Sequence, residues 1–431
     1  MKLHSDVKCK LVDFGLPRGM RDISPDEFDS SELVRTAFLE TCALFDYPVM
    51  EPSTLELLET LEAKSGPAIR DEIYFFKDKS DRELGLRFDL TVGITRYVCS
   101  KRELAPPIRL GSFGSMWRYD EPQYGRFRWF YQWDAELFGP SNAEADAEII
   151  EFTSLLFKKL GRSPSILLGS RKLVEQYIRR ELKMDEEKRI LDALRAVDKL
   201  SKKDLQLIAK EYERSLGIED LRKLSEFVQI RGSADDVGAR LLDYHLDPSP
   251  LSRIVDSLTS RGVKDIEINL GVVRGIDYYT DMVFEAIDKE NPRLGSLCGG
   301  GRYDSLPPIY GRPDLGATGV AGGVERAVLF LTREKSASKK RIFVAPIGSD
   351  PEIVKTASSI ASELRQCGIA AQSEISGKSL RKVLETQSSQ GTTAVVIVGQ
   401  RELAQQSVKV KWMKSGEEIT VRISELRTLL A

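Results

Sequence analysis

The segment from Trp117 to Glu136 limits the possible folds of this 431-residue chain more strongly than any other stretch. Two strand-like arms flank residues 120–125, where a proline and a glycine favour a loop. In the second arm, polar side chains take nearly all the even positions and aromatic side chains most of the odd ones. Successive strand residues point to opposite faces of a sheet. The sequence therefore predicts a β-hairpin whose second arm presents polar groups on one face: Arg126, Arg128, Gln132, Asp134 and Glu136.

Two arginines of this hairpin suggest a phosphate ligand. Arg118 ends the first arm, and Arg126 follows the loop. A guanidinium group offers paired donors that match phosphate oxygens, so both side chains suit a triphosphate. The ordinary alternative is a solvated sheet face whose charges keep the protein soluble. The hairpin on its own leaves both interpretations open.

Composition excludes several classes of function. The formal net charge is -2, so any bound polyanion must be held by local basic patches. The five cysteines are scattered without a CxxC pair, and His4 and His245 are the two histidines, which argues against a disulfide framework and a zinc site. No apolar run approaches the roughly 18 residues that span a bilayer, and the N-terminal residues lack a signal-peptide core. We therefore expect a cytoplasmic protein with no membrane partner.

Changes of pattern along the chain predict an α+β protein of several domains. Strand patterns dominate residues 83–136, and a charged helical pattern covers 165–261 before strand signals resume at 266–273. After a Lys/Ser-rich stretch, strands and helices alternate, as in a small α/β domain. The predicted divisions are a first part of a main domain at 1–164, a helical insertion at 165–262, the second part at 263–332, a linker at 333–341 and a C-terminal α/β domain at 342–431.

Four further segments carry chemistry. Leu84–Thr91 (LGLRFDLT) looks like a strand, and its carboxylate and hydroxyl could clamp an ammonium group. Residues 272–280 (VVRGIDYYT) end in paired tyrosines, and residues 297–306 (LCGGGRYDSL) form a glycine-rich element. Residues 319–326 (GVAGGVER) read as a tight helix start, where an arginine suits phosphate chemistry.

These segments resemble the three motifs of the class II aminoacyl-tRNA synthetases. The hairpin is similar to motif 2, which implies that Arg118 grips the α-phosphate of ATP and Arg126 contacts the outer phosphates. Glu51-Pro52 after a helix over residues 32–45 resembles motif 1, which forms the dimer interface in that class. GVAGGVER resembles motif 3, whose arginine, here Arg326, packs on ATP.

Within that class the chain most resembles the histidyl-tRNA synthetase family. RGIDYY and GGGRYD are similar to its two signatures, and RFDLT resembles its archaeal and eukaryotic form. The resemblance implies a class II catalytic domain with an antiparallel sheet flanked by helices, a helical insertion and a C-terminal anticodon-binding domain. It implies a homodimer that uses L-histidine, ATP with Mg²⁺, and tRNA(His).

The same resemblance assigns roles to individual residues. Arg118 and Arg274 become the catalytic residues, and Arg274 lies beside the α-phosphate and the histidine carboxylate. Glu136 and Tyr279 face the two imidazole nitrogens. The full implied histidine-binding set is Asp89, Leu90, Thr91, Gln132, Glu136, Arg274, Tyr278, Tyr279 and Tyr303. Protein ligands for Mg²⁺ are not assignable from the sequence.

Three alternatives compete with this interpretation. The strongest is a synthetase-like regulatory subunit of ATP phosphoribosyltransferase, which has no aminoacylation activity and usually lacks the C-terminal domain. Another class II synthetase, such as one for proline, threonine or glycine, would lack RGIDYY. A tRNA-binding or structural paralogue would not need the arginines at 118, 274 and 326. Two basic segments, 376–382 and 408–414, are candidates for tRNA contact, although each alone reads as a solvated helix or edge strand.

Overall fold

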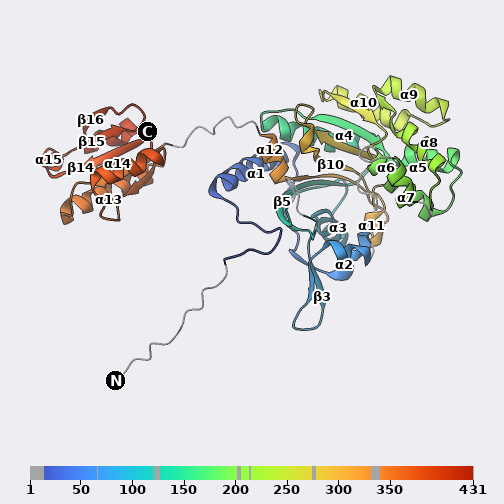
Figure 1. The fold of residues 1–431 in the computed structure, drawn as a ribbon, viewed down its shortest axis with the longest axis horizontal. Coiled ribbons are helices and arrows are strands. Elements are labelled where there is room, and N and C mark those ends of the chain that lie inside the picture. Colours follow the sequence, from blue (N-terminus) through green and yellow to red (C-terminus); the bar gives the residue numbers. More distant parts are fainter. Residues whose placement is uncertain are drawn as a thin grey trace. The chain divides into compact units, whose positions relative to one another are not determined.

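The computed structural model describes residues 14–65, 67–119, 121, 127–200, 205–212, 215–273, 278–331 and 340–430. The chain forms two compact units that divide between Thr332 and Arg333 (Figure 1). Each unit has its own apolar core. The mixture of antiparallel and mixed sheets with helices confirms the α+β class predicted from the sequence.

An eight-stranded sheet forms the centre of the first unit. Its strand order is β4-β5-β11-β10-β9-β6-β8-β7, and all described neighbours are antiparallel except the parallel pair β6 and β8. In chain order the strands are β4 (Ile108–Trp117), β5 (Trp129–Gly139), β6 (Ser165–Ser170), β7 (Arg231–Gly232), β8 (Ile266–Asn269), β9 (Met282–Ile287), β10 (Ser296–Arg302) and β11 (Gly316–Gly323). The predicted hairpin is the β4–β5 pair, with Trp117 opposite Trp129.

Helices cover the face of the sheet that receives the odd residues of β5. The Trp133 ring is buried and lies 6.0 Å from Phe38 of α1 (Pro25–Phe45) and 6.3 Å from Phe157 of α4 (Ala143–Lys159), measured between ring centroids. A third helix, α12 (Val324–Phe330), follows β11 directly. Helix α1 starts at a capping box, in which Ser24 and Glu27 each accept a hydrogen bond from the other's backbone nitrogen. The aromatic face of β5 therefore forms core.

A small three-stranded sheet and short helices lie near the other face. The strand order is β1-β3-β2, all antiparallel. The elements are β1 (Leu55–Leu57), α2 (Leu58–Ser65), η1 (Pro67–Glu72), β2 (Phe75–Lys77), β3 (Glu83–Leu86), α3 (Thr91–Ser100) and α11 (Leu306–Ile309). The short η2 (Pro292–Leu294) instead packs against α12, and its Leu294 belongs to the core on the helix-covered face. Before β1, Val49 forms a single parallel bridge with Gly111 of β4.

Six helices gather at one end of the first unit (Figure 1). They are α5 (Arg171–Glu181), α6 (Glu187–Leu200), α7 (Leu205–Glu211), α8 (Ile218–Val228), α9 (Ala234–Asp243) and α10 (Ser249–Ser260). Their apolar faces join the core that lies under the main sheet. The prediction of helix from residue 165 was wrong at its start, because Ser165–Ser170 forms β6 between β9 and β8. This stretch is short, apolar and fully paired, which periodicity alone cannot distinguish from a buried helix turn.

The second unit is a five-stranded mixed sheet with helices. Its strand order is β13-β12-β14-β15-β16; the pairs of β12 are parallel and the later two pairs are antiparallel. The elements are β12 (Arg341–Pro346), α13 (Pro351–Gln366), β13 (Ala370–Ser373), α14 (Leu380–Ser389), β14 (Ala394–Val398), α15 (Gln400–Ala404), β15 (Ser407–Trp412), β16 (Glu418–Arg422), η3 (Ile423–Glu425) and α16 (Leu426–Leu430). The alternation predicted for the C-terminal part is therefore present.

Candidate functional site

The even residues of β5 form a buried polar surface on the sheet. Gln132, Asp134 and Glu136 are 4%, 0% and 1% exposed, although each carries a strongly polar side chain. Burying such groups is costly unless they are hydrogen-bonded. The Gln132 side-chain nitrogen donates to Asp134 Oδ1 at 2.9 Å, so the row is internally connected. This arrangement excludes the solvated-face alternative for the part of the arm that the structure describes.

Arg118 lies at one end of this row. Its Nε donates to the Phe88 carbonyl at 2.8 Å, and its Nη2 donates to Gln132 Oε1 at 3.3 Å. The guanidinium carbon lies 5.0 Å from the centre of the Phe130 ring, within cation–π range. The head group is thus held by the protein while it keeps further donors for an anion.

Three tyrosines surround the other end of the row. The Tyr303 hydroxyl donates to Glu136 Oε2, and both side chains are buried. The Tyr278 ring lies 5.8 Å from Tyr303 and 4.5 Å from Tyr279, between ring centroids. Burial, followed by the negative charge of Glu136, raises the pKa of Tyr303 well above its usual range. Tyr303 is therefore a neutral donor at physiological pH.

Tyr278 lies near enough to the same carboxylates for their negative charges to affect its pKa. Burial, and then the negative charge of Asp89, raises the pKa of Tyr278, with smaller contributions from Glu136 and Asp134. The Tyr278 hydroxyl lies 3.4 Å from the Tyr279 hydroxyl. The structure thus gathers β5, the residues after β10 and the tyrosine pair of RGIDYY around one small volume.

Asp89, Leu90 and Thr91 enter this volume from the start of a helix. The strand predicted over residues 84–91 was wrong beyond Leu86, where β3 ends, and α3 begins at Thr91. Asp89 Oδ1 accepts a hydrogen bond from the Val92 nitrogen at 3.1 Å, which satisfies a backbone donor of the first helical turn. Thr91 Oγ1 donates to Asp134 Oδ2 at 3.3 Å. The predicted clustering with β5 holds even though the element is a helix start.

Glycines make the close packing around Glu136 possible. Gly319 of β11 pairs with Glu136, and a Cβ built on it would lie 1.5 Å from Glu136 Oε2. A Cβ on Gly300 would lie 2.0 Å from the Gly319 carbonyl oxygen. The glycines of GGGRYD and GVAGGVER therefore allow three strands to approach around one carboxylate.

The charged residues of GGGRYD, Arg302 and Asp304, form hydrogen bonds that stabilise the fold around Tyr303. Arg302 is 4% exposed, and its Nη2 donates to Asp146 Oδ1 at 2.7 Å. Asp304 Oδ1 accepts from Arg302 and from the Ala317 nitrogen at 2.8 Å. These bonds fix the turn that places Tyr303 in the pocket.

The remaining predicted site residues divide into two groups. Arg326 follows the start of α12, and its Nη1 donates to the Ser296 carbonyl at 2.6 Å, at the opposite end of β10 from Tyr303. This bond places its guanidinium group beside the end of β10 that is farther from Tyr303. Arg126 and Arg274 lie outside the residues that the structure describes.

Sequence reasoning gave no role to two residues that support the site. Asp134 stood in the alternating row without an assignment, yet it bonds to both Gln132 and Thr91. Arg87 is buried and links the Glu51-Pro52 segment to β4. Its guanidinium group donates to the Ser115 carbonyl, to the Pro52 carbonyl at 2.6 Å and to Glu51 Oε1 at 2.6 Å. The one feature of the sequence that could have pointed to Arg87 is its position two residues before Asp89 in the RFDLT segment.

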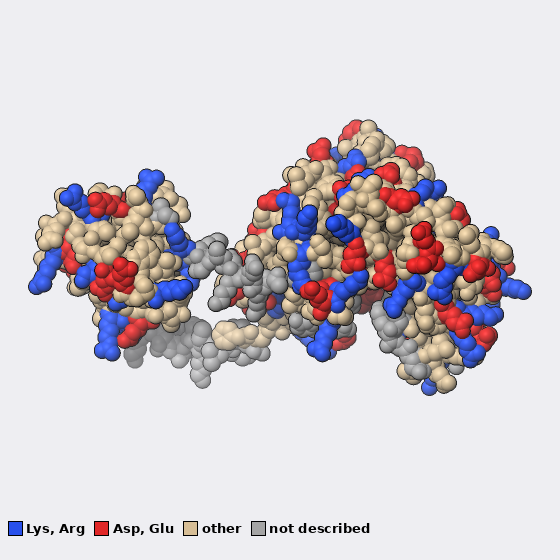
Figure 2. All heavy atoms as spheres, turned by 90° about the horizontal axis from the view of Figure 1, so that it is seen from above, with Lys and Arg blue, Asp and Glu red and all other residues tan. Residues whose placement is uncertain are grey.

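The described residues hold no cluster of three or more histidine, cysteine, aspartate or glutamate side chains arranged for a metal ion. Among the same residues, no helix is both long and apolar enough to cross a membrane. Figure 2 shows basic and acidic side chains interspersed on the face that it draws. On that face, the two signs of charge do not separate into one large basic area.

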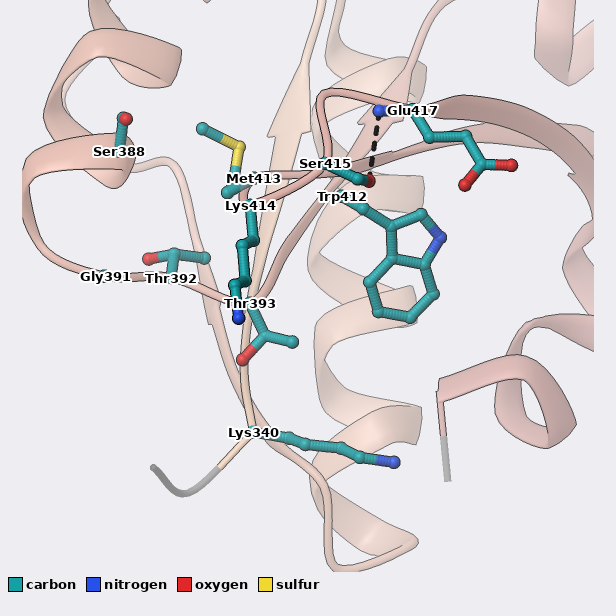
Figure 3. Close-up of a pocket in the computed structure, with 10 residues that line it drawn as sticks. All are labelled: Lys340, Ser388, Gly391, Thr392, Thr393, Trp412, Met413, Lys414, Ser415 and Glu417. Carbon is teal, nitrogen blue, oxygen red and sulfur yellow. Dashed lines mark hydrogen bonds between the residues drawn. The ribbon is translucent and has the colours of Figure 1, made fainter. Parts of the chain in front are cut away.

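A cavity of about 940 Å³ lies in the second unit, at the turn between β15 and β16. Figure 3 shows Lys414 running toward Thr393, with Trp412 and Lys340 lining the same cavity. An aromatic ring beside amino groups suits a nucleotide chain. In the two basic segments that are candidates for tRNA contact, Lys411 is already paired with Glu418 at 2.8 Å, and Arg381 with Glu385 at 3.0 Å.

Two protein families match the chain, and their boundaries agree with the two units. Residues 19–327 match the family described as histidyl-tRNA synthetase. Residues 341–431 match the anticodon binding domain family.

Relatives match nearly the whole length. A histidine–tRNA ligase of Thermococcus kodakarensis is 32% identical over 417 residues, covering 94% of this chain and 95% of that protein. One from Methanocaldococcus jannaschii is 31% identical over 420 residues, covering 96% and 99%.

Solved structures share the fold. A histidyl-tRNA synthetase from Nostoc sp. PCC 7120 aligns with a TM-score of 0.80 at 23% identity, covering 97% of this chain and 99% of that one. A protein from Bacillus halodurans described as an ATP phosphoribosyltransferase regulatory subunit/histidyl-tRNA synthetase aligns with a TM-score of 0.72 at 24% identity, covering 90% and 99%.

Proposed function

The chain belongs to the histidyl-tRNA synthetase family, and we propose that its buried polar site activates L-histidine with ATP and passes it to tRNA(His). The observation that carries this proposal is the connected row of Arg118, Gln132, Asp134 and Glu136 on one face of β5. A phosphate-binding group stands at one end of the row and a carboxylate–tyrosine pair at the other. Such a row spans a substrate that is anionic at one end and polar at the other.

Histidine recognition uses the Glu136 end of the row. Imidazole has one donor and one acceptor nitrogen at fixed separation. Glu136 accepts from the imidazole N–H, and Tyr279 completes the pair at the other nitrogen. Tyr303 holds Glu136, and Tyr278 lines the pocket. A site that hydrogen-bonds its substrate in this way discriminates strongly against side chains that lack these groups.

The amino group of histidine is bound by groups on α3 and β5. Asp89 and Thr91 lie at the start of α3, where Leu90 precedes the first helical residue. Gln132 approaches from β5, and its bond to Asp134 supports this placement. Carboxylate, hydroxyl and amide oxygens are all acceptors, which an ammonium group requires.

Adenylate formation takes place at the Arg118 end. A carboxylate oxygen of histidine attacks the α-phosphorus of ATP in line; the P–O bond to pyrophosphate breaks, and pyrophosphate leaves. Such phosphoryl transfer depends mostly on positioning and charge neutralisation. Arg118 and Arg274 neutralise the α-phosphate, Arg126 binds the outer phosphates, and Arg326 packs against the nucleotide. Mg²⁺ bound together with ATP would supply further neutralisation of the phosphate charge, and no protein ligand is assigned to it.

The second step joins histidine to tRNA. The 3'-terminal adenosine hydroxyl attacks the adenylate carbonyl, and AMP leaves. The second unit binds the anticodon, which the match to an anticodon binding domain over residues 341–431 supports. The finer division into a catalytic domain at 1–164 and 263–332, a helical insertion at 165–262 and a linker at 333–341 remains part of the proposal.

The active form is a homodimer in the cytoplasm. Large apolar side chains of α1 stay exposed in the single chain, with Leu33 at 52% and Leu44 at 66%. An exposed apolar row of this kind indicates an interface. Glu51 and Pro52 follow that helix and are tied to Arg87. No disulfide joins the four cysteines that the structure describes, which suits a reducing compartment.

Charging of tRNA tests the function. Purified chain, ATP, Mg²⁺ and unfractionated tRNA are incubated with each radioactive amino acid, and acid-precipitable label is counted. We expect label from histidine alone. Absence of label from all twenty, in protein that still binds histidine, would favour the regulatory-subunit alternative.

Arg274 provides a second test. Arg274→Ala is expected to abolish most adenylate formation and leave tRNA affinity nearly unchanged, because its proposed contacts are the α-phosphate and the histidine carboxylate. Equal losses of pyrophosphate exchange and of tRNA binding would contradict the assignment of Arg274 to the α-phosphate and the histidine carboxylate.

A further inference from the structure

Asp134 lies at the centre of the polar row and is 0% exposed. Its two carboxylate oxygens accept from different elements: Oδ1 from Gln132 Nε2 at 2.9 Å, and Oδ2 from Thr91 Oγ1 at 3.3 Å. A fully buried carboxylate is costly, so a site that retains one has a use for it. Gln132 and Thr91 are both assigned to the amino group of histidine.

The neighbours of Gln132 determine which way its amide faces. Arg118 offers only donors, and its Nη2 lies 3.3 Å from Gln132 Oε1. On the other side, Asp134 Oδ1 accepts a hydrogen bond from the Gln132 NH₂ group. Opposite partners on the two sides prevent the amide from flipping. The carbonyl oxygen is therefore kept on the Arg118 side of the row.

Thr91 is oriented by the same carboxylate. Its hydroxyl hydrogen is directed to Asp134 Oδ2, so its oxygen lone pairs point elsewhere. A threonine in this state can only accept from a further ligand. Asp134 thus makes two neighbouring groups act as acceptors at once.

We propose that Asp134 is the positioning residue for the α-ammonium group of the substrate. It acts through Gln132 and Thr91 by keeping their oxygens available as acceptors, and its buried charge favours a cation in the pocket. This inference rests on the proposed function, since it deepens the recognition of histidine at that site.

The test separates the ammonium group from the rest of the substrate. Histidinol keeps the ammonium and imidazole groups and lacks the carboxylate, whereas 3-(imidazol-4-yl)propionate keeps the imidazole and carboxylate groups and lacks the ammonium. Binding of both probes to the full-length protein and to Asp134→Asn is measured by calorimetry. The substitution keeps the size of the side chain, removes its charge and lets it donate a hydrogen bond.

Histidinol affinity should fall at least ~10-fold in Asp134→Asn, because charge-assisted contacts are lost, whereas propionate affinity should change by less than about twofold or rise. Retained binding of the propionate also reports an intact pocket. Equal weakening of both probes would assign Asp134 a merely structural role, and unchanged histidinol binding would remove its role altogether.

Glu148→Gln serves as the matched control. Glu148 is a partly buried carboxylate of α4 that accepts from Arg109 at 2.7 Å and Tyr47 at 3.0 Å. Its neutralisation should leave the ratio of the two affinities unchanged. Histidine-dependent pyrophosphate exchange by the unsubstituted protein is measured in the same series. Its absence would count against the proposed function. The present inference fails when exchange is intact and either both probes weaken equally or histidinol binding is unchanged.

Discussion

At the scale of single residues, the position and burial of the Glu136 side chain depend on residues far away in the sequence. Its Oε2 accepts from Tyr303, 167 positions later, and the space that it fills exists because Gly319 has no side chain. Alternation in β5 predicts that Gln132, Asp134 and Glu136 share a face. It cannot predict that this face is buried, because burial depends on Tyr303, Tyr278 and the start of α3, which other segments provide.

Glu136→Gln tests the imidazole contact. The substitution replaces a charged acceptor with a neutral amide, and a hydrogen bond to a charged group is worth roughly 1.5–3 kcal/mol. We expect the KM for histidine in pyrophosphate exchange to rise by about 10- to 100-fold while the KM for ATP stays within about twofold. A larger effect on ATP than on histidine would contradict the assignment.

Cysteine reactivity tests the burial seen in the first unit. Burial raises the pKa of the Cys42 thiol to about 12 and that of Cys99 to about 11, whereas Cys367 is exposed. The thiolate is the reactive form, so at pH 8 the two buried thiols should resist iodoacetamide in the native protein. Among the four cysteines that the structure describes, peptide mapping should find Cys367 alkylated first. Rapid labelling of Cys42 or Cys99 would mean that the core opens readily.

At the scale of elements, the fold of the site depends on three strands meeting without side chains between them. Gly319 lies opposite Glu136 on β11, and Gly300 of β10 faces the Gly319 carbonyl. Strand and helix patterns predicted the β4–β5 hairpin. The helix start predicted at residues 319–326 was wrong for 319–323, which form the end of β11, and α12 begins at Val324. The patterns also failed for residues 87–91 and 165–170, where tertiary pairing rather than local periodicity decides the element.

Two glycine substitutions test this packing. Gly319→Ala places a Cβ that would lie 1.5 Å from Glu136 Oε2, so the carboxylate must move. We expect at least a ~10-fold rise in the KM for histidine. Gly323→Ala is the matched control on the same strand, because its added Cβ meets no atom within 4 Å and its φ of -73° suits alanine. Similar effects of the two changes would refute the packing argument.

At the scale of the whole molecule, the chain has two units with separate cores, and our proposal assigns amino-acid activation to the first and anticodon binding to the second. The first contains the polar row, and the second has its own sheet and apolar clusters. The linker expected at residues 333–341 rested on a Lys/Ser-rich stretch followed by a change to strand–helix alternation. The sequence could not predict the cavity beside Trp412, because that hollow forms only when the β15–β16 turn lies against Thr393.

Removal of the second unit tests the proposed separation of amino-acid activation from anticodon binding. A chain ending at Thr332 keeps every described residue of the polar row. We expect histidine-dependent exchange to persist within about threefold, while kcat/KM for tRNA charging falls at least ~10-fold, because anticodon contacts are lost. Loss of exchange in a truncated chain that remains folded by circular dichroism would show that the units depend on one another.

Pyrophosphate exchange with each of the twenty amino acids tests the central claim most directly. The full-length protein is supplied with ATP, Mg²⁺, labelled pyrophosphate and one amino acid at a time, and label in ATP is counted. Our account predicts exchange with histidine alone, because only imidazole matches Glu136 and the tyrosines around it. Exchange with a different amino acid, or with none in protein whose fold is intact, would contradict it.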